Sequence, residues 1–477
     1  MHQDCLLAID IPALLTELRD LLSSPIDGAS LAVFRLLYGA IFFVHYIIGW
    51  EFEVLRYTNT SYNFHYELTP FIVPLKKRGM NLLLGIQILA AFSLAIGFLS
   101  PYSAFILFLT SAYKLLMDKS LYTNHAYLHV LICLLLSVVD AGKVMSMDSY
   151  LWGSGEQGFE ISFWQVLIFK LQILIVYFYG GMSKLNYDWL FRAMPLRNLF
   201  ADKSYYFLQR NIGRFIKGES SQYTARVFSF FIIPYFAAWS GMFIDLFVIW
   251  FMLFEETLYY ALAIYLCFTV LNHKFFEIGT FPYMNYAFVV LFLSQVYSRS
   301  VVGLFFGDTQ GGSGADLFMS DFEFFFFIVY LAIQLVIPMR RFVKTYIIRL
   351  GKSDIHADNA WYFSWNMMHA VKHGKVSFDV YDLSTKRSLS LEGVSHEQIV
   401  LGTKQEHCLR TRPRCAIQYV KFLEGILRRN AYKNFGIRVN SQIDINCSGM
   451  KMKINPRANL CKEEVKAYGS YWWHLDD

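Results

Sequence analysis

Charged residues are scarce in this chain of 477 residues: Asp, Glu, Lys and Arg make up only 17% of it, whereas a soluble domain averages about 25%. Hydrophobic residues make up 55% and aromatic residues 18%. This composition excludes a disordered, fibrous or collagenous chain, and it excludes a small scaffold held together by disulfides. The long apolar stretches favour a protein that crosses a membrane several times.

Two further scarcities narrow the possible functions. No block of Lys or Arg stands apart from the apolar stretches and the net charge is only +6, so we expect no nucleic-acid partner. The seven cysteines are scattered, without a CxxC motif or a paired Cys/His spacing, so we expect no metal site. Four of them lie in the last 70 residues, and the sequence leaves open whether they are thiols or disulfides.

The apolar residues predict three parts of the chain. Residues 1–24 lack the basic region of a cleavable signal, and their Leu, Ile and Ala residues share one helical face, which indicates an amphipathic helix at the membrane interface. Residues 25–340 predict an all-α polytopic membrane bundle of about eight or nine transmembrane helices. The stretches that carry this prediction lie near 30–49, 81–99, 101–117, 125–139, 160–180, 227–254, 257–271, 285–306 and 321–339.

The composition changes after the last apolar stretch. Residues 353–477 predict a soluble α+β module that covers one face of the bundle. In it we expect two strand pairs, 375–382 with 387–393 and 437–446 with 450–456, and a helix over 416–431. Most Lys and Arg residues up to residue 352 fall in loops on the same side of the membrane as this module. The positive-inside rule therefore predicts that this side is cytoplasmic, although a cationic active site would bias the same count.

Polar residues at membrane depth are costly and are candidates for function. They gather in four segments, 118–125, 177–189, 272–282 and 361–369, and all four fall on the side of the module. Polar residues placed independently of one another would not all have to lie on the same side of the membrane. A single pocket at the membrane face, roofed by the module, would produce this arrangement.

Each segment also has a structural interpretation. Asn124 and His125 form a helix cap or a reacting pair, and His129 one turn later lacks the glutamate and third ligand of a metal site. Lys184 follows a Gly pair and is either a base whose charged form is disfavoured by apolar surroundings or a lysine that snorkels to the interface. The segment 272–282 lines a pocket or merely connects two helices, and the aromatic segment 361–369 covers an apolar ligand or a peptide or forms the module's core.

At these segments the chain resembles the vitamin K-dependent gamma-glutamyl carboxylases and their bacterial relatives with an HTTM domain. Order and rough spacing agree from about residue 25 to residue 470. Several short motifs in order are far more specific than one alone. The matching stretches are Ala29-Ser30-Leu31-Ala32-Val33-Phe34-Arg35, Asp118-Lys119 through Asn124-His125-x-Tyr127-Leu128, Ile175-Val176-Tyr177-Phe178 through Lys184-Leu185 with Asp188-Trp189, Phe276-x-Ile278-Gly279-x-Phe281, Ser364-Trp365-Asn366-Met367-Met368 and, more weakly, Asn455-Pro456-Arg457.

The resemblance implies an enzyme of the bacterial inner membrane, although in the animal enzymes this face lies in the secretory lumen. Such an enzyme oxidises reduced vitamin K, a naphthohydroquinone, to its epoxide with O2. The released energy removes a γ-proton from a glutamate of a peptide or protein, and CO2 adds to the carbanion. No metal is required. The implied partners are the lipid bilayer, the quinone and the glutamate-containing substrate.

The resemblance also implies roles for single residues. Lys184 matches the catalytic lysine that deprotonates the hydroquinone, and His125 and Asn124 match the pair near the reacting centre. The residues expected to bind substrate are Asp118, Tyr122, Phe276, Gly279, Ser364, Trp365, Met367, Met368 and Arg457.

Two departures from the animal enzymes bear on carboxylation. Ser183 stands where they have a second lysine, and Asn366 replaces an Asp. Quinone epoxidation is therefore better supported than carboxylation. The alternatives are a membrane transporter, or a lipid- or quinone-binding scaffold that kept the bundle without the chemistry. A membrane acyltransferase using Asn124 and His125 is a third, and it gives Lys184 no role.

Overall fold

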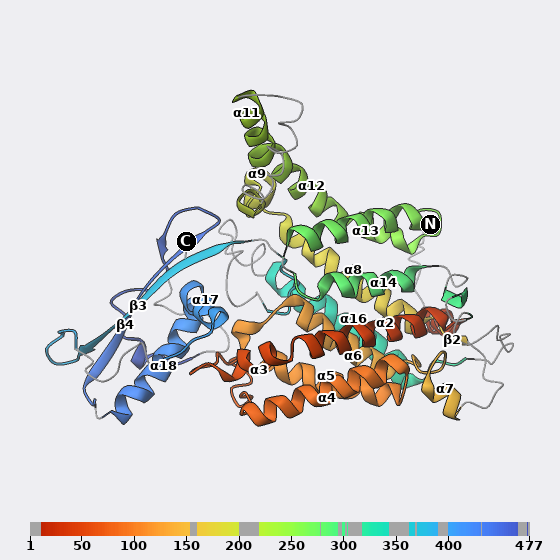
Figure 1. The fold of residues 1–477 in the computed structure, drawn as a ribbon, viewed down its shortest axis with the longest axis horizontal. Coiled ribbons are helices and arrows are strands. Elements are labelled where there is room, and N and C mark those ends of the chain that lie inside the picture. The colour runs from red at the N-terminus through yellow and green to blue at the C-terminus, as the bar shows by residue number, and fades with distance from the viewer. Residues whose placement is uncertain are drawn as a thin grey trace, which may run out of the picture.

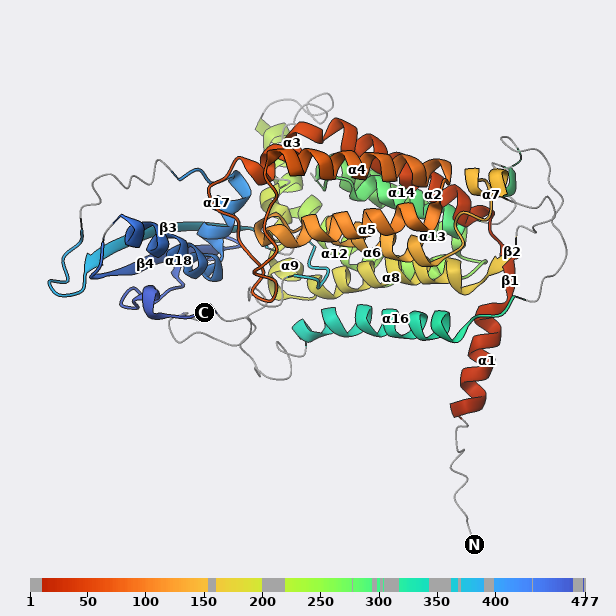
Figure 2. The same cartoon turned by 90° about the horizontal axis from the view of Figure 1, so that it is seen from below.

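A bundle of long helices forms one end of the molecule, and a small module of helices and strands forms the other (Figures 1 and 2). The computed structural model describes residues 11–152, 160–199, 219–276, 278–293, 298–300, 303, 317–342, 362–367, 370–389, 399–430, 432–465 and 475.

Most of the long helices of the bundle fall on predicted apolar stretches. Several of these helices begin or end at Gly or Pro. For example, Gly97 has a left-handed backbone conformation and ends the helix α4 (Lys77–Ile96). The elements of the bundle are α1 (Ile11–Ser23), α2 (Ala29–Ile48), α3 (Trp50–Thr58), α4 (Lys77–Ile96), α5 (Ser100–Met117), η1 (Lys119–Leu121), α6 (Asn124–Val138), α7 (Met147–Trp152), α8 (Trp164–Lys184), α9 (Tyr187–Arg192), α11 (Glu219–Val227), η2 (Phe228–Ile232), α12 (Ile233–Leu246), η3 (Val248–Leu253), α13 (Leu258–Phe275), α14 (Phe281–Phe292) and α16 (Asp321–Phe342).

Five helices among the described residues are long and apolar enough to cross a membrane: α2, α4, α8, α16 and the continuous helical stretch Gln222–Leu253. Two shorter apolar helices, α6 and α14, lie between them. Outward-facing side chains such as Leu82, Leu89, Phe325 and Val336 are 65–68% exposed, which suits contact with lipid tails. The chain is thus a mostly helical membrane protein, whereas the total of eight or nine spans stays a prediction.

The end of the bundle far from the module is closed by a short sheet that the sequence did not indicate. Strand β1 (Pro25–Asp27) pairs antiparallel with β2 (Glu160–Ser162) and so joins the start of α2 to the start of α8. The motif residue Arg35 lies near this end, fully buried, and donates to the carbonyl oxygen of Leu94 at 2.8 Å. Helix α1 leaves the bundle here and points away from it (Figure 2).

The module contains the sheet β3 (Lys372–Asp382), β4 (Phe435–Ile445) and β5 (Lys451–Met452), together with α17 (Thr403–Thr411), α18 (Pro413–Arg429) and η7 (Leu460–Lys462). The apolar face of α18 carries Ile417, Val420 and Leu423, which pack against Ile437 and Val439 of β4. The helix expected over 416–431 and the pairing of 437–446 with 450–456 are confirmed.

The other expected strand pair, 375–382 with 387–393, is confirmed as far as the structure describes it, because the N–H of Leu389 donates to the carbonyl oxygen of Val380 at 2.8 Å and the N–H of Asp382 donates to that of Arg387 at 3.0 Å. Strand β3 pairs along its whole length with β4, from Lys372 opposite Ile445 to Asp382 opposite Phe435. Ser388 forms an antiparallel bridge to Tyr381, and residues 390–398 lie outside the described part. Strand β3 thus pairs with β4 along its whole length and with residues 387–389 near its C-terminal end.

The module is not self-contained, because the bundle completes its core. Phe64, in the loop between α3 and α4, is fully buried among the apolar residues of the module. Ser61 of the same loop exchanges hydrogen bonds with Val400, donating its backbone N–H at 2.7 Å and accepting at its hydroxyl at 3.0 Å. The loop therefore fixes the module against one end of the bundle.

Candidate active site

Lys184 is the last residue of α8, and its side chain is buried rather than directed to the interface. Its Nζ donates to Oδ2 of Asp245, an equally buried residue of α12. The ring of Trp189 lies on another side of the ammonium group, with its centroid 5.4 Å from Nζ. The lysine is thus held in an apolar site by one acid and one aromatic ring.

The Gly pair before Lys184 sets how closely α12 approaches α8. A Cβ placed on Gly181 would lie 2.7 Å from Cγ of Leu246 and 3.1 Å from Cβ of Asp245, so only glycine fits there. A Cβ on Gly180 would lie 3.4 Å from Oδ2 of Asp245 and 3.5 Å from Sδ of Met367. The same glycine face therefore brings both Asp245 and Met367 to the end of α8.

Met367 belongs to the segment 362–367, which lies across the end of the bundle. Trp365 of this segment is fully buried and stacks on Tyr127 of α6, with 4.8 Å between ring centroids. Phe363 and Trp365 have φ of 59° and 53°, a left-handed conformation that is strained for bulky residues and is seen where surroundings enforce it. Ser364 is buried, and its hydroxyl donates to the carbonyl oxygen of Tyr362 at 3.2 Å. Met368 lies outside the described residues.

The start of α6 holds this segment in place. Asn124 donates from Nδ2 to the carbonyl oxygen of Asn366 at 2.7 Å. The hydroxyl of Tyr122 accepts from the backbone N–H of Phe363 at 2.9 Å and donates to Oδ1 of Asn124 at 3.2 Å. Thr123 caps the helix by accepting from the N–H of Ala126. Asn124 is thus hydrogen-bonded to the segment 362–367, which we call the roof segment. The helix cap that the sequence predicts for 118–125 is provided by Thr123.

His125, the next residue, faces the third predicted segment. Gly279 has a left-handed φ of 58°, and a Cβ placed on it would lie 2.9 Å from Nε2 of His125. Phe276, three residues earlier, packs against Trp189 and Ala238, close to the lysine. The four segments that the sequence singled out are therefore linked by pairwise contacts: 177–189 meets 361–369 at Gly180 and Met367, 361–369 meets 118–125 at Asn366 and Asn124, and 118–125 meets 272–282 at His125 and Gly279.

His129, one turn after His125, is engaged elsewhere. Its Nδ1 lies 2.9 Å from the hydroxyl of Tyr38, and its Nε2 lies 2.8 Å from that of Tyr46. Tyr46 continues toward Ser111 at 3.4 Å. Both ring nitrogens are thus used in a buried chain of polar side chains. No group of three metal-ligating side chains occurs within the described ranges.

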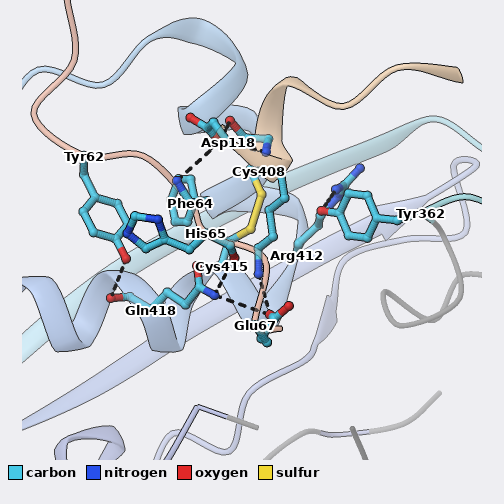
Figure 3. A network of polar contacts seen from close by, with 12 residues as sticks. Tyr62, Phe64, His65, Glu67, Asp118, Tyr362, Cys408, Arg412, Cys415 and Gln418 are labelled. Atoms are coloured by element: carbon cyan, nitrogen blue, oxygen red, sulfur yellow. Dashed lines mark hydrogen bonds and ion pairs between the residues drawn. A yellow bond between two sulfur atoms is a disulfide. The ribbon is translucent and has the colours of Figure 1, made fainter. Parts of the chain in front are cut away.

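Asp118 lies in the joint between bundle and module (Figure 3). It accepts from the backbone N–H of Ser120 at 2.8 Å, from that of Phe64 at 3.3 Å and from Nε2 of Gln405 at 3.0 Å. Burial raises the pKa of this carboxyl group, and these hydrogen bonds oppose the rise. Its oxygens are occupied by the protein, so its geometry suits fastening the module.

The rest of the joint is also polar. Gln418 of α18 donates to the carbonyl oxygen of His65 at 2.9 Å, and Lys119 forms an ion pair with Glu67 at 2.6 Å. A disulfide joins Cys408 and Cys415 beside these contacts, across the turn between α17 and α18 (Figure 3). Cys408 and Cys415 are two of the four C-terminal cysteines whose redox state the sequence left open, and they are therefore oxidised.

Arg457 lies in the module on the loop after β5. Its side chain is exposed, and its backbone N–H donates to Oδ1 of Asn455 at 3.0 Å. Among the described residues, no hydrogen bond or ion pair joins its side chain to Lys184 or His125. The structure thus brings together the predicted residues of the bundle and the roof segment but not Arg457.

Sequence reasoning missed Asp245 and Asn285. Asn285 of α14 donates from Nδ2 to the hydroxyl of Tyr177 at 2.8 Å, on the same face of α8 as Lys184. A signal existed for Asp245, because it is the only charged residue in the apolar stretch 227–254. An isolated acid at membrane depth is itself a functional candidate.

Two family models match the chain. The model described as "HTTM domain" matches residues 23–297, and that described as "Vitamin K-dependent gamma-carboxylase, lumenal domain" matches residues 319–477. The first match alone covers more than half of the chain. No solved structure matches it.

Proposed function

The chain belongs to the vitamin K-dependent gamma-carboxylase family, and from this premise we propose the reaction that it catalyses. It oxygenates a reduced naphthoquinone to the epoxide with O2 and couples this reaction to carboxylation of glutamate side chains by CO2. The observation that carries the proposal is that four distant segments contact one another in series and that one of them contains the buried Lys184. A structural lysine at the interface would need no such enclosure.

The residues around Lys184 suit a reduced naphthoquinone. Aromatic rings provide apolar walls, since Tyr177 lies 5.6 Å from Tyr265 and 6.1 Å from Phe281 between centroids. Oδ1 of Asp245 and Oδ1 of Asn285 are buried without a hydrogen-bond partner among the described residues. A buried polar atom without a partner costs about 1–3 kcal/mol. The hydroxyl groups of a flat aromatic ligand would satisfy these atoms.

In the proposed mechanism the reduced quinone, when oxygenated, supplies a base strong enough to remove a γ-proton from glutamate. Lys184 accepts a hydroxyl proton at Nζ to start the reaction. His125 presents Nε2 beside the backbone of Gly279, where it hydrogen-bonds to the reacting centre. Trp365 and Tyr127 exclude water that would otherwise quench the base.

Other residues hold the substrates. Asn124 and Tyr122 keep the roof segment closed through Asn366 and Phe363, and Met367 contacts the apolar ligand. Arg457 is exposed, and we assign it to the carboxylates of the glutamate-containing peptide. Ser364, Phe276 and Met368 remain proposed contacts of the quinone.

We further propose that residues 1–24 lie at the interface, that 25–340 span the membrane and that 353–477 cover the active-site face outside the cytoplasm. The disulfide between Cys408 and Cys415 supports this orientation, because disulfides persist in oxidising compartments. It opposes the orientation indicated by loop charge. Labelling of the exposed Cys447 in intact cells by a membrane-impermeant maleimide tests it, and labelling only after lysis would refute it.

The test of function uses the full chain in lipid nanodiscs with reduced vitamin K, O2, radiolabelled CO2 and a glutamate-rich peptide. We expect epoxide and labelled peptide, and we expect Lys184→Ala to abolish both. Epoxide without labelled peptide would leave only the oxygenase half. Neither product from well-folded protein would refute the enzyme and favour a quinone-binding scaffold or a transporter.

A further inference from the structure

Asp245 is the acid that contacts Lys184, and it comes from a helix 61 residues further along the chain. The exposed fractions of Asp245 and Lys184 are only 1% and 6%. A Cβ on residue 181 would lie 2.7 Å from Cγ of Leu246 and 3.1 Å from Cβ of Asp245, so the missing side chain lets α12 approach α8 this closely. Gly181 therefore supports the close approach that brings Asp245 to Lys184.

A purely structural ion pair does not account for this geometry. Buried charges lose their solvation, and a buried pair breaks even only when its remaining hydrogen-bonding positions are filled. Oδ1 of Asp245 has no partner among the described residues. The ion pair of Lys119 with Glu67, in contrast, is supported by Gln418, which lies 3.4 Å from the same carboxylate oxygen. Asp245 thus keeps one buried oxygen, Oδ1, without a hydrogen-bond partner in the described part of the chain.

The pair also changes what Lys184 can do. A lysine that donates to a carboxylate carries its full set of protons and has no lone pair to act as a base. If it is to take a proton from the substrate, it must pass one of its own protons on. Oδ2 of Asp245 is the acceptor that already lies in contact with Nζ.

We propose that Asp245 is the proton acceptor through which Lys184 works. Nζ of Lys184 takes the hydroxyl proton of the reduced naphthoquinone while one of its own protons moves along the existing hydrogen bond to Oδ2 of Asp245. The O–H bond of the substrate breaks and an N–H bond forms; a second N–H bond breaks and an O–H bond forms on Asp245. The lysine keeps one positive charge, the carboxylate becomes neutral and the substrate keeps the negative charge, so the site stays electrically neutral.

This inference rests on the proposed function and adds Asp245 to it as a positioning residue. The ammonium group that remains next to the negatively charged substrate stabilises it, which a neutral amine acting alone could do only after protonation. His129 cannot serve as the acceptor in its present contacts, because Tyr38 and Tyr46 occupy both of its ring nitrogens.

The experiment compares Asp245→Asn, Asp245→Glu and the wild-type chain in nanodiscs. The matched control is Asp27→Asn, a buried ion-paired acid at the opposite end of the bundle, 4% exposed. We expect Asp245→Asn to lower kcat for epoxide about a hundredfold or more, the usual contribution of a proton acceptor, with little change in KM. Asp245→Glu should restore part of the rate. The residual rate of Asp245→Asn should follow a different pH profile, since the carboxylate that accepts the proton is then missing.

A second readout does not depend on turnover. Infrared difference spectroscopy without O2 should show the C=O band of a protonated carboxylic acid when reduced naphthoquinone is added. The band should be present in the wild type and in Asp27→Asn and absent in Asp245→Asn. Its loss in Asp245→Asn that still binds the quinone identifies Asp245 as the acceptor.

The possible failures are distinguishable. If the wild type forms epoxide and Asp245→Asn matches it in kcat and pH profile, the role of Asp245 is refuted while the proposed function stands. If the infrared band persists in Asp245→Asn, the proton goes elsewhere and the inference is again refuted. If the wild type forms no epoxide, the proposed function fails, and the absence of the band on quinone binding would refute the inference as well.

Discussion

Replacing each glycine of the pair by alanine gives a matched test of the site, because the two positions differ only in what faces them. Both lie near the end of α8, where alanine favours the helix over glycine by about 1 kcal/mol. At Gly180 the new methyl group would meet its nearest atom at 3.4 Å, an ordinary contact. At Gly181 it would meet Cγ of Leu246 at 2.7 Å and Cδ2 at 2.8 Å, so the Leu246 side chain or α12 itself must shift.

The magnitudes follow from these distances. Gly180→Ala should be as stable as the wild type or up to about 1 kcal/mol more stable. Gly181→Ala adds an overpacking cost of about 1–3 kcal/mol, so it should range from neutral to about 2 kcal/mol less stable. Moving α12 also carries Oδ2 of Asp245 away from Nζ of Lys184. Since a misplacement of about 1 Å can cost a hundredfold in rate, we expect at least a tenfold loss of epoxide formation.

The assay pairs thermal unfolding of the purified variants in one detergent with epoxide formation in nanodiscs. A lower unfolding midpoint and a slow rate for Gly181→Ala, with a maintained midpoint for Gly180→Ala, would support the tight approach of α12. Equal midpoints and equal rates for the two variants would refute the reasoning, because the Cβ of residue 181 would then have room and Asp245 would not depend on it.

Three further predictions concern other parts of the site and its roof. Gly279→Ala combines a left-handed φ with a contact to His125, so it should cost about 1–2 kcal/mol and reduce epoxide formation as His125→Ala does, measured by unfolding midpoint and product assay. Phe64→Ala removes a fully buried ring, costing about 3–5 kcal/mol, and should make the module sensitive to limited proteolysis. Burial raises the pKa of the Cys461 thiol to about 11, so roughly one molecule in a thousand is thiolate at pH 8. Iodoacetamide should therefore label the exposed Cys447 first, and labelling of Cys461 should rise with each pH unit up to about 11, as mass spectrometry would show.

Local patterns in the sequence predict the elements of this protein well. The apolar stretches mark the bundle helices, and the periodicity of 416–431 marks α18, because each helix buries one face of its own residues. The pairing of β3 with β4 could not be predicted in this way. In both strands apolar and polar residues alternate, so each could pair with several other strands. The actual partner depends on which face of the sheet α18 covers.

The residues of the candidate site also fall into two groups, those that local sequence patterns indicate and those that they do not. Lys184, His125 and Asn124 could be found because they stand in polar segments that interrupt apolar stretches. Phe64 could not be assigned to the module, since nothing in its neighbourhood distinguishes an aromatic residue that packs on lipid from one that fills a distant core. Patterns within one sequence segment indicate residues whose neighbours in space are also neighbours in sequence. They do not indicate residues whose neighbours in space come from another part of the chain.

Asp245 shows why this difference matters for mechanism. Considered alone, Lys184 suggests a base that acts because apolar surroundings remove its charge. With Asp245 in contact, the charge need not be removed, since the carboxylate stabilises the ammonium group and accepts the proton that the reaction releases. The same lysine is thus given a different role once its partner is known, and the missing side chain of Gly181 allows the close approach of α12 that brings this partner to it. The glycine, the lysine and the acid act as one unit, so a substitution at any of the three should impair the first step of the proposed reaction.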